Sequence, residues 1–270
     1  MAMRQADSDD GTEIFYRVTG PADARTLVLV HGWAVDHSCW GGAAADLAER
    51  YRVIAVDLRG HGYSGAPETG YDDPRAWAAD LSAVLRAEDA TDAVLVGWSY
   101  GGLVITDYVA VCGTANVAGL VYVGAVTSMG RDQPGGRTGA AMTASIPGVF
   151  AEDAETALAG FGEFGDALTG PGHPVEAQRI LGTNLATRPR VRKAMFYRTT
   201  GNDAVLRDLD VPALLLHGTR DPISDIASAE HAATLIPDAR TSYWTDAQHG
   251  LFVEDTERFV REVSEFVDSL

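Results

Sequence analysis

Gly97-Trp98-Ser99-Tyr100-Gly101 decides the fold, because it places a serine between two glycines at the junction of two apolar segments. The run 93–96 before it is typical of a short buried strand, and 103–109 after it has the apolar face of a helix. A serine at such a strand-to-helix turn needs glycines on both sides, since a Cβ there would collide with the strand or the helix. The sequence therefore predicts a nucleophile elbow, with Ser99 as the nucleophile.

Composition and charge narrow the class of protein. The chain has 270 residues, of which 46% are hydrophobic and 22% charged, the balance of an ordinary globular protein. Its formal charge of −17 argues against nucleic acid or an anionic membrane as a partner. Cys39 and Cys112 lack the spacing of a zinc site or a disulfide framework, so we expect no metal. No apolar run is long enough for a membrane span or a secretion signal, which predicts a cytoplasmic protein.

Short apolar strands alternate with amphipathic segments along most of the chain. This pattern predicts an α/β fold with a mostly parallel central sheet flanked by helices. The expected strands lie at 14–18, 26–30, 53–56, 93–96, 120–123, 214–216 and 241–244, and the expected helices near 38–49, 74–88, 100–112, 224–235 and 256–269.

The alternation stops between residues 128 and 206. A turn-rich stretch, 130–136, opens a segment with helical patterning and scattered Gly and Pro. We interpret 128–206 as a helical cap or lid, inserted into a core domain formed by 1–127 and 207–270. Apolar side chains from the lid, the elbow and the loop after the strand at 26–30 are candidates to bind substrate: Trp33, Tyr100, Met129, Phe161, Phe164 and Phe196.

A serine nucleophile needs a base, and the base needs an orienting acid. Of seven histidines, His249 is the best base, since it lies in a loop between the last strand and the terminal helix. Asp221 is the favoured acid because it follows the buried strand at 214–216, with Asp225 as the alternative. Asp246, beside the histidine, is interpreted as a surface residue. The order Ser99, Asp221, His249 is the order expected for a nucleophile elbow of this kind.

The backbone N–H groups of Trp33 and Tyr100 are the expected oxyanion donors, one from the loop after the strand at 26–30 and one from the residue after the nucleophile. His31 is interpreted as a brace of that loop. In the glycine-rich stretch 57–65, we assign Asp57, Arg59 and His61 to the scaffold.

Together these residues resemble the α/β-hydrolase superfamily, from about Thr26 to the end of the chain, with the lid as the divergent part. The stretches 93–97 and 113–121 look like the bacterial arylesterase and cofactor-free haloperoxidase/perhydrolase group. Two positions differ from that group, which often has a proline in the loop after His31-Gly32 and a small polar residue or Met at Tyr100. The resemblance implies a serine hydrolase with no cofactor.

The resulting hypothesis is hydrolysis of carboxylic esters of small to medium apolar substrates through an acyl-enzyme intermediate. A serine at position 99 excludes the aspartate-nucleophile chemistry of haloalkane dehalogenases and epoxide hydrolases. Lactone hydrolysis and cofactor-free perhydrolysis or haloperoxidation stay open as alternatives, since they need the same residues. A ligand-binding receptor built on a hydrolase scaffold is the non-enzyme alternative, and binding without product formation would favour it. The sequence does not fix the oligomeric state.

Overall fold

Eight strands form one sheet, in the order β1-β2-β4-β3-β5-β6-β7-β8. The computed structural model describes residues 2–270. Strand β2 runs antiparallel to its neighbours β1 and β4, and every other pair in the sheet is parallel. The strands span Ala2–Asp7 (β1), Glu13–Thr19 (β2), Thr26–Val30 (β3), Arg52–Val56 (β4), Ala93–Trp98 (β5), Val117–Val123 (β6), Ala213–Gly218 (β7) and Ala239–Trp244 (β8). The predicted α/β class with a mostly parallel sheet is confirmed.

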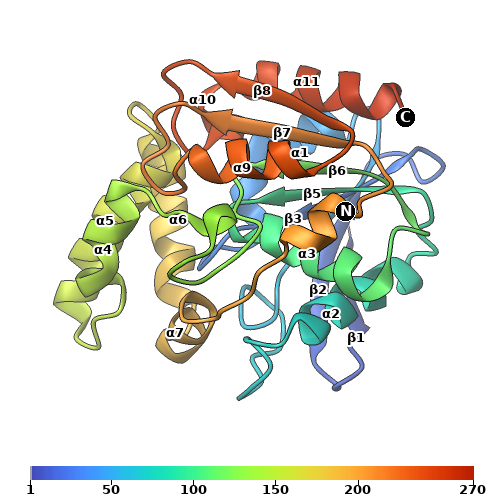
Figure 1. The fold of residues 1–270 in the computed structure, drawn as a ribbon. Helices are drawn as coiled ribbons and strands as arrows, with labels where there is room; N and C mark the ends of the chain where they lie inside the picture. The colour runs from blue at the N-terminus through green and yellow to red at the C-terminus, as the bar shows by residue number, and fades with distance from the viewer. Residues whose placement is uncertain (1) are drawn as a thin grey trace.

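Helices cover both faces of this sheet (Figure 1). On β6, Gly119 faces Phe266 and Leu270 at the C-terminal end, whereas Tyr122, three positions along, packs on Gly102 of α3. Residues an odd number of positions apart point to opposite faces of a strand, so these contacts define the two layers. The helices of the core are α1 (Gly41–Leu47), α2 (Pro74–Ala87), α3 (Tyr100–Cys112), α9 (Ala227–Leu235), α10 (Leu251–Glu254) and α11 (Thr256–Asp268), with a 3₁₀ turn η1 (His37–Trp40).

Local sequence explains where these elements start. Strands β3, β5 and β7 are buried along their whole length, as expected for central parallel strands read as continuous apolar runs. Helix α2 begins at Pro74 after Asp73, whose carboxylate accepts the N–H of Arg75. Asp255 caps α11 in the same way, by accepting the N–H of Arg258. These caps satisfy N–H groups that the first helical turn leaves free.

Strand β1 was not predicted, and its composition explains why. Its sequence, Ala-Met-Arg-Gln-Ala-Asp, lacks the apolar alternation that marks a strand. It pairs with β2 at the edge of the sheet, where one side of a strand needs no apolar cover. Arg4 of β1 forms an ion pair with Glu88, at the end of α2. Pairing and charge therefore hold a strand that hydrophobic patterning does not reveal.

The segment between β6 and β7 is helical. It contains η2 (Pro134–Gly136), α4 (Ala140–Val149), α5 (Ala154–Thr169), α6 (Pro174–Ala186), α7 (Pro189–Phe196) and α8 (Asp203–Arg207). In Figure 1, α4 to α7 stand beside the ends of the sheet toward which the arrows of β7 and β8 point. In parallel α/β sheets, functional side chains gather at this carboxyl edge.

Within residues 2–270, no helix combines the length and the apolar character needed to cross a membrane.

Candidate active site

Ser99 lies at a sharp turn between β5 and α3, with φ 55° and ψ −119°. A positive φ is strained for a residue with a side chain, and such strain is common at functional sites. The two flanking glycines are required by close packing. A Cβ at Gly97 would lie 2.6 Å from the carbonyl carbon of Gly101, and a Cβ at Gly101 would overlap the carbonyl oxygen of Val30. The elbow therefore tolerates glycine alone at both positions.

The loop after β3 passes directly over the nucleophile. A Cβ at Gly32 would lie 3.0 Å from the Cβ of Ser99 and 3.5 Å from its Oγ. Trp33 follows in this loop and lines the same pocket as Ser99. Tyr100 is the first residue of α3, so its N–H is among those that have no partner within the helix. The two predicted oxyanion donors thus belong to segments that flank Ser99.

His249 and Asp221 form a buried pair. Nδ1 of His249 lies 2.7 Å from Oδ2 of Asp221, and both side chains are fully buried. Because the carboxylate accepts from Nδ1–H, the ring is held as the tautomer with a free lone pair on Nε2. Among the described residues this Nε2 is buried and has no hydrogen-bond partner. It is thereby available to accept a proton.

The other carboxylate oxygen of Asp221 is also fixed. Oδ1 accepts the backbone N–H groups of Ile223 and Ser224, at 2.8 and 2.9 Å. Burial alone would raise the pKa of Asp221, but the charge and hydrogen bonds of His249 and His217 outweigh it and hold the pKa below its ordinary range. Asp221 is therefore ionised at neutral pH, and its charge can stabilise an imidazolium at His249.

Two neighbours fix the histidine loop itself. The indole N–H of Trp98 donates to the carbonyl oxygen of His249 at 3.1 Å, so this tryptophan of the elbow also braces the base. Gly124, at the end of β6, has φ 50°, and a Cβ there would lie 3.1 Å from Nδ1 of His249 and 3.2 Å from Oδ2 of Asp221. The His249–Asp221 pair therefore packs against Gly124 closely enough to leave little room for a side chain there.

The alternative acids lie elsewhere. Asp225 lies in the turn before α9, where its Oδ1 accepts the N–H of Ala227 at 2.9 Å. Asp246 is exposed and pairs with Arg220 at 2.7 Å. The structure brings His249 together with Asp221.

A second histidine contacts the acid and was not predicted. His217 is fully buried at the end of β7, with Nε2 2.9 Å from the carbonyl oxygen of Ser224 and 3.3 Å from Oδ2 of Asp221. A carbonyl oxygen only accepts, so Nε2 carries the hydrogen and faces both oxygens. One feature of the sequence could have indicated this contact: His217 lies at the end of an apolar strand, and Asp221 follows four residues later.

An apolar pocket of about 50 Å³ lies above Ser99. It is lined by Trp33, Ser99, Tyr100, Val126, Met129, Thr138, Met142, Phe196, Ile223 and Ser224. Four of the six predicted substrate residues are therefore among its walls. The phenol of Tyr100 is turned toward Trp77, with ring centroids 5.8 Å apart, and burial raises the pKa of Tyr100 to about 12.

Phe161 and Phe164 differ from the prediction. Both lie on α5 and are buried against Trp33, with ring centroids 6.4 and 5.6 Å from it. They support the wall formed by Trp33, and among the described residues they do not line the pocket. Sequence patterning shows that these aromatic residues are buried but not which buried layer each one joins. Thr138, Ile223 and Ser224 were missed because they come from irregular segments.

His31 and His61 are buried beside the loop that carries Trp33. Nδ1 of His31 donates to the carbonyl oxygen of Gly32 at 2.8 Å, and Nε2 accepts the N–H of Leu58 at 3.0 Å. Nε2 of His61 accepts the N–H of Ala34 at 3.2 Å. Burial lowers the pKa of His31 to about 4 and that of His61 to about 3. Both rings are neutral braces, in line with the scaffold roles expected for them.

These lowered pKa values predict acid destabilisation. Between the ordinary histidine pKa of about 6.5 and the lower folded values, the unfolded chain binds protons that the folded chain does not. Stability therefore falls as pH drops from about 6.5 toward 4. In His61→Gln, the amide oxygen can still accept from Ala34 but does not titrate. We expect its free energy of unfolding to depend less steeply on pH, by about 1.4 kcal/mol per pH unit. Urea unfolding at pH 7, 6 and 5 measures the free energy of unfolding of both proteins. An equal dependence on pH in wild type and His61→Gln would disprove the prediction.

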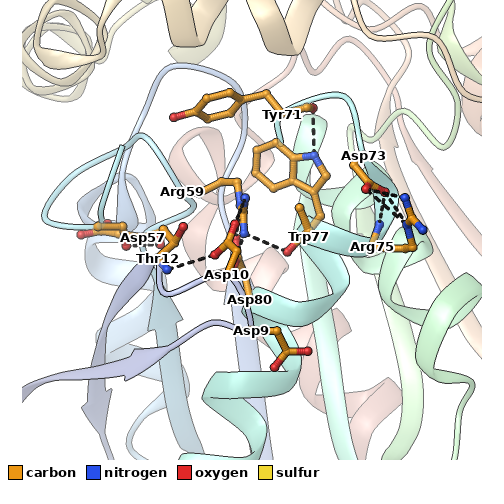
Figure 2. Close-up of polar contacts among 12 residues, drawn as sticks. Asp9, Asp10, Thr12, Asp57, Arg59, Tyr71, Asp73, Arg75, Trp77 and Asp80 are labelled. Carbon is orange, nitrogen blue, oxygen red and sulfur yellow. Dashed lines mark hydrogen bonds and ion pairs between the residues drawn. The ribbon is translucent and has the colours of Figure 1, made fainter. Parts of the chain in front are cut away.

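Asp57 and Arg59 make scaffold contacts. Asp57 accepts the N–H groups of His37 and Tyr63, at 2.8 and 3.0 Å. Arg59 is fully buried and donates from Nε and Nη2 to both oxygens of Asp80, at 2.7 and 2.6 Å. Figure 2 shows this guanidinium between Asp10 and the start of α2. These bonds join the loop after β4 to α2.

Asp36, His37 and Asp57 form the one cluster in residues 2–270 whose donor atoms are close enough to hold a metal ion. Those atoms already have partners. Oδ1 of Asp57 accepts from the His37 ring at 2.8 Å, and Oδ1 of Asp36 caps η1 through the N–H of Ser38 at 2.9 Å. Hydrogen bonding within the fold accounts for this cluster.

Comparisons with known proteins show which family this chain belongs to. Residues 27–262 match the alpha/beta hydrolase family. The chain is 32% identical to a non-heme haloperoxidase of Rhodococcus erythropolis, over 97% of this chain and 98% of that protein. An esterase from Rhodococcus sp. ECU1013 is similar in structure, with a TM-score of 0.98 and 55% identity over the full length of both chains. A second solved structure, a putative aryl esterase from Burkholderia cenocepacia, has a TM-score of 0.89 at 29% identity, over 99% of this chain and 98% of that chain. The chain belongs to the alpha/beta hydrolase family.

Proposed function

We propose that this protein hydrolyses carboxylic esters of small to medium apolar substrates, with Ser99 as nucleophile, His249 as base and Asp221 as acid. One observation carries the proposal. The buried carboxylate of Asp221 holds the His249 ring so that Nε2 has a free lone pair. Ser99 of the nucleophile elbow lines a small apolar pocket. The similar esterase of Rhodococcus sp. ECU1013 supports the same reaction class.

The proposed reaction has two halves. His249 takes the hydroxyl proton of Ser99 while Oγ attacks the ester carbonyl carbon, and the tetrahedral intermediate collapses as Nε2–H protonates the departing alcohol. Water then enters, gives its proton to His249 and attacks the acyl carbon. The acyl–Oγ bond breaks, the proton returns to Ser99, and the carboxylic acid leaves. Asp221 keeps the tautomer and stabilises the imidazolium formed in each half.

The N–H groups of Trp33 and Tyr100 are the proposed oxyanion donors. Fixed backbone donors stabilise charge that develops in the transition state, because they need no reorganisation as the reaction proceeds. The loop over Ser99 and the start of α3 are the segments in contact with the reacting oxygen in this scheme.

Pocket size supports a short acyl or alcohol group. A cavity of about 50 Å³ with walls of Val126, Met129, Met142 and Ile223 accommodates few carbon atoms without movement. We propose that segment 128–206 is a cap over this pocket, since it supplies several of its walls. We also propose that the substrate is a small-molecule ester and that the protein is cytoplasmic.

The test is a stopped-flow burst with p-nitrophenyl esters. If an acyl-enzyme forms, p-nitrophenol should be released in a burst close to one equivalent of enzyme whenever deacylation is the slower half. Across acetyl, butanoyl and octanoyl esters, kcat/KM should fall with acyl length. A flat profile would contradict the size argument, and binding without turnover of any ester or lactone would favour a receptor.

Perhydrolysis is a second candidate, favoured by the similarity to a haloperoxidase. Hydrogen peroxide would replace water in the second half, so that the acyl group leaves as a peracid and Ser99 is regenerated. Bromination of monochlorodimedone with acetate, peroxide and bromide measures this activity. If it exceeds ester hydrolysis by the same preparation, perhydrolysis is the main reaction.

A further inference from the structure

Three successive peptide groups of the loop over Ser99 are held by side chains. His31 donates to the carbonyl oxygen of Gly32 at 2.8 Å, and His61 accepts the N–H of Ala34 at 3.2 Å. The third contact comes from the helical segment, where Nδ2 of Asn184 on α6 donates to the carbonyl oxygen of Ala34 at 2.7 Å. The Trp33 N–H, the proposed oxyanion donor, belongs to the first of these groups.

Planarity makes these contacts directional. In a trans peptide the carbonyl oxygen and the following N–H point in opposite directions, so holding an oxygen also aims an N–H. His31 fixes the plane that contains the Trp33 N–H. His61 and Asn184 fix the next two planes. Ala34 has φ 59°, an unfavourable conformation for a residue with a Cβ, which persists only where its surroundings enforce it.

Asn184 is built into a closed set of contacts between the helical segment and the loop. The side chain of Asn184 is fully buried, and the backbone carbonyl oxygen of Asn184 accepts from Nη1 of Arg192 at 3.0 Å. The carbonyl oxygen of Arg192 in turn accepts the indole N–H of Trp33 at 3.0 Å. The guanidinium of Arg192 lies 4.5 Å from the ring centroid of Phe161, which packs on Trp33. Helices α6 and α7 thus hold the side chain of Trp33 and the backbone of Ala34 together.

We infer that Asn184 is a positioning residue for the oxyanion hole: it acts through Ala34 to keep the Trp33 N–H aimed at the transition state. This inference rests on the proposed function. Its consequence is that segment 128–206, besides forming walls of the pocket, sets the geometry of a catalytic donor. Without the Asn184 bond, the Ala34 conformation loses one of its restraints and the Trp33 N–H becomes less well aimed.

The test compares Asn184→Leu and Asn184→Ala with wild type. Both variants remove the donor, but leucine fills the space and alanine leaves a cavity. Their melting temperatures should therefore differ, whereas their kcat values for p-nitrophenyl acetate should fall by a similar factor of about ten, with KM changed less than two-fold. This loss is smaller than the 10²–10³-fold that outright removal of an oxyanion donor costs in kcat. A transition-state interaction lowers kcat and leaves ground-state binding alone.

Thr183→Val is the matched control, because Thr183 neighbours Asn184 on α6 and its hydroxyl bonds within the helix, to the carbonyl oxygen of Ile180. Its kcat should stay within two-fold of wild type. A further readout is inhibition by an alkyl boronic acid, which forms a tetrahedral adduct: its Ki should rise in step with the loss of kcat in both Asn184 variants.

Two results would overturn the inference. One is full kcat in a folded Asn184→Leu, and the other is a kcat loss that follows the melting temperature from variant to variant. Neither outcome contradicts the proposed function, whose own test is whether Ser99→Ala loses activity.

Discussion

Ser99→Ala is expected to lose kcat for ester hydrolysis by about 10⁴–10⁶-fold, the range found when the nucleophile of a serine triad is removed. The fold should survive, because the substitution deletes one hydroxyl and keeps the Cβ that the elbow already accommodates. Hydrolysis of p-nitrophenyl acetate by purified variant, with circular dichroism and the melting temperature as folding controls, measures it. Activity within ten-fold of wild type in a folded variant would refute Ser99 as nucleophile.

The two histidines near the elbow provide a matched comparison. In His249→Gln the loss of kcat should approach that of Ser99→Ala, since the substitution removes the proposed base. His31→Gln removes a brace whose ring nitrogens are both hydrogen-bonded to backbone groups, and it should retain far more activity. A larger loss of kcat in His31→Gln than in His249→Gln would instead identify His31 as the base.

Asp221→Asn is expected to lower kcat by about 10⁴-fold, as in another serine hydrolase where the acid of the triad became an amide. The structure supplies a specific reason. Oδ1 of Asp221 accepts two backbone N–H groups, from Ile223 and Ser224, so the amide oxygen must stay there. The NH₂ group is then turned toward His249, where it donates to Nδ1 and moves the ring hydrogen to Nε2. The base would be held in the wrong tautomer.

Asp225→Asn is the control for this substitution, because Asp225 is the alternative acid and its Oδ1 bonds to the N–H of Ala227. Its kcat should stay within about three-fold of wild type, since the amide oxygen of asparagine can still accept the N–H of Ala227 and the His249–Asp221 pair is unchanged. A large loss of kcat in Asp225→Asn, with little loss in Asp221→Asn, would identify Asp225 rather than Asp221 as the acid.

The pKa of Asp221 also links the triad to acid stability. A carboxylate whose pKa is lowered on folding stabilises the fold above its unfolded pKa of about 3.9, and that contribution is lost as pH falls toward the folded value. The stability difference between wild type and Asp221→Asn should therefore narrow below about pH 4. Urea unfolding at pH 7 and at pH 3.5 measures it.

Much of the fold could be predicted because its central strands are buried on both faces. Runs such as Leu27–Val30 and Leu214–Leu216 are apolar throughout, and a capping aspartate precedes helices such as α2 and α11. Strand β1 escaped prediction because pairing with β2 and an ion pair to Glu88 hold it, and neither leaves a periodic trace.

The candidate site likewise has a part that the sequence predicts and a part that it does not. Ser99, Asp221 and His249 each follow a strand of one sheet, so the sequence already predicted that all three lie at one edge of it, and the structure brings His249 and Asp221 into contact. Contacts between the helical segment and the core could not be derived, since they depend on how α5, α6 and α7 are rotated. For this reason Phe161 and Phe164 were expected in the pocket but lie behind Trp33, and Asn184 was not identified.

Covalent labelling with a fluorophosphonate tests the central claim most directly. We expect wild type to gain one adduct by intact mass, with peptide mapping that assigns it to Ser99, and loss of esterase activity in proportion to labelling. Ser99→Ala should gain none under the same conditions. Labelling at another residue, or full esterase activity after Ser99 has been modified, would contradict the account.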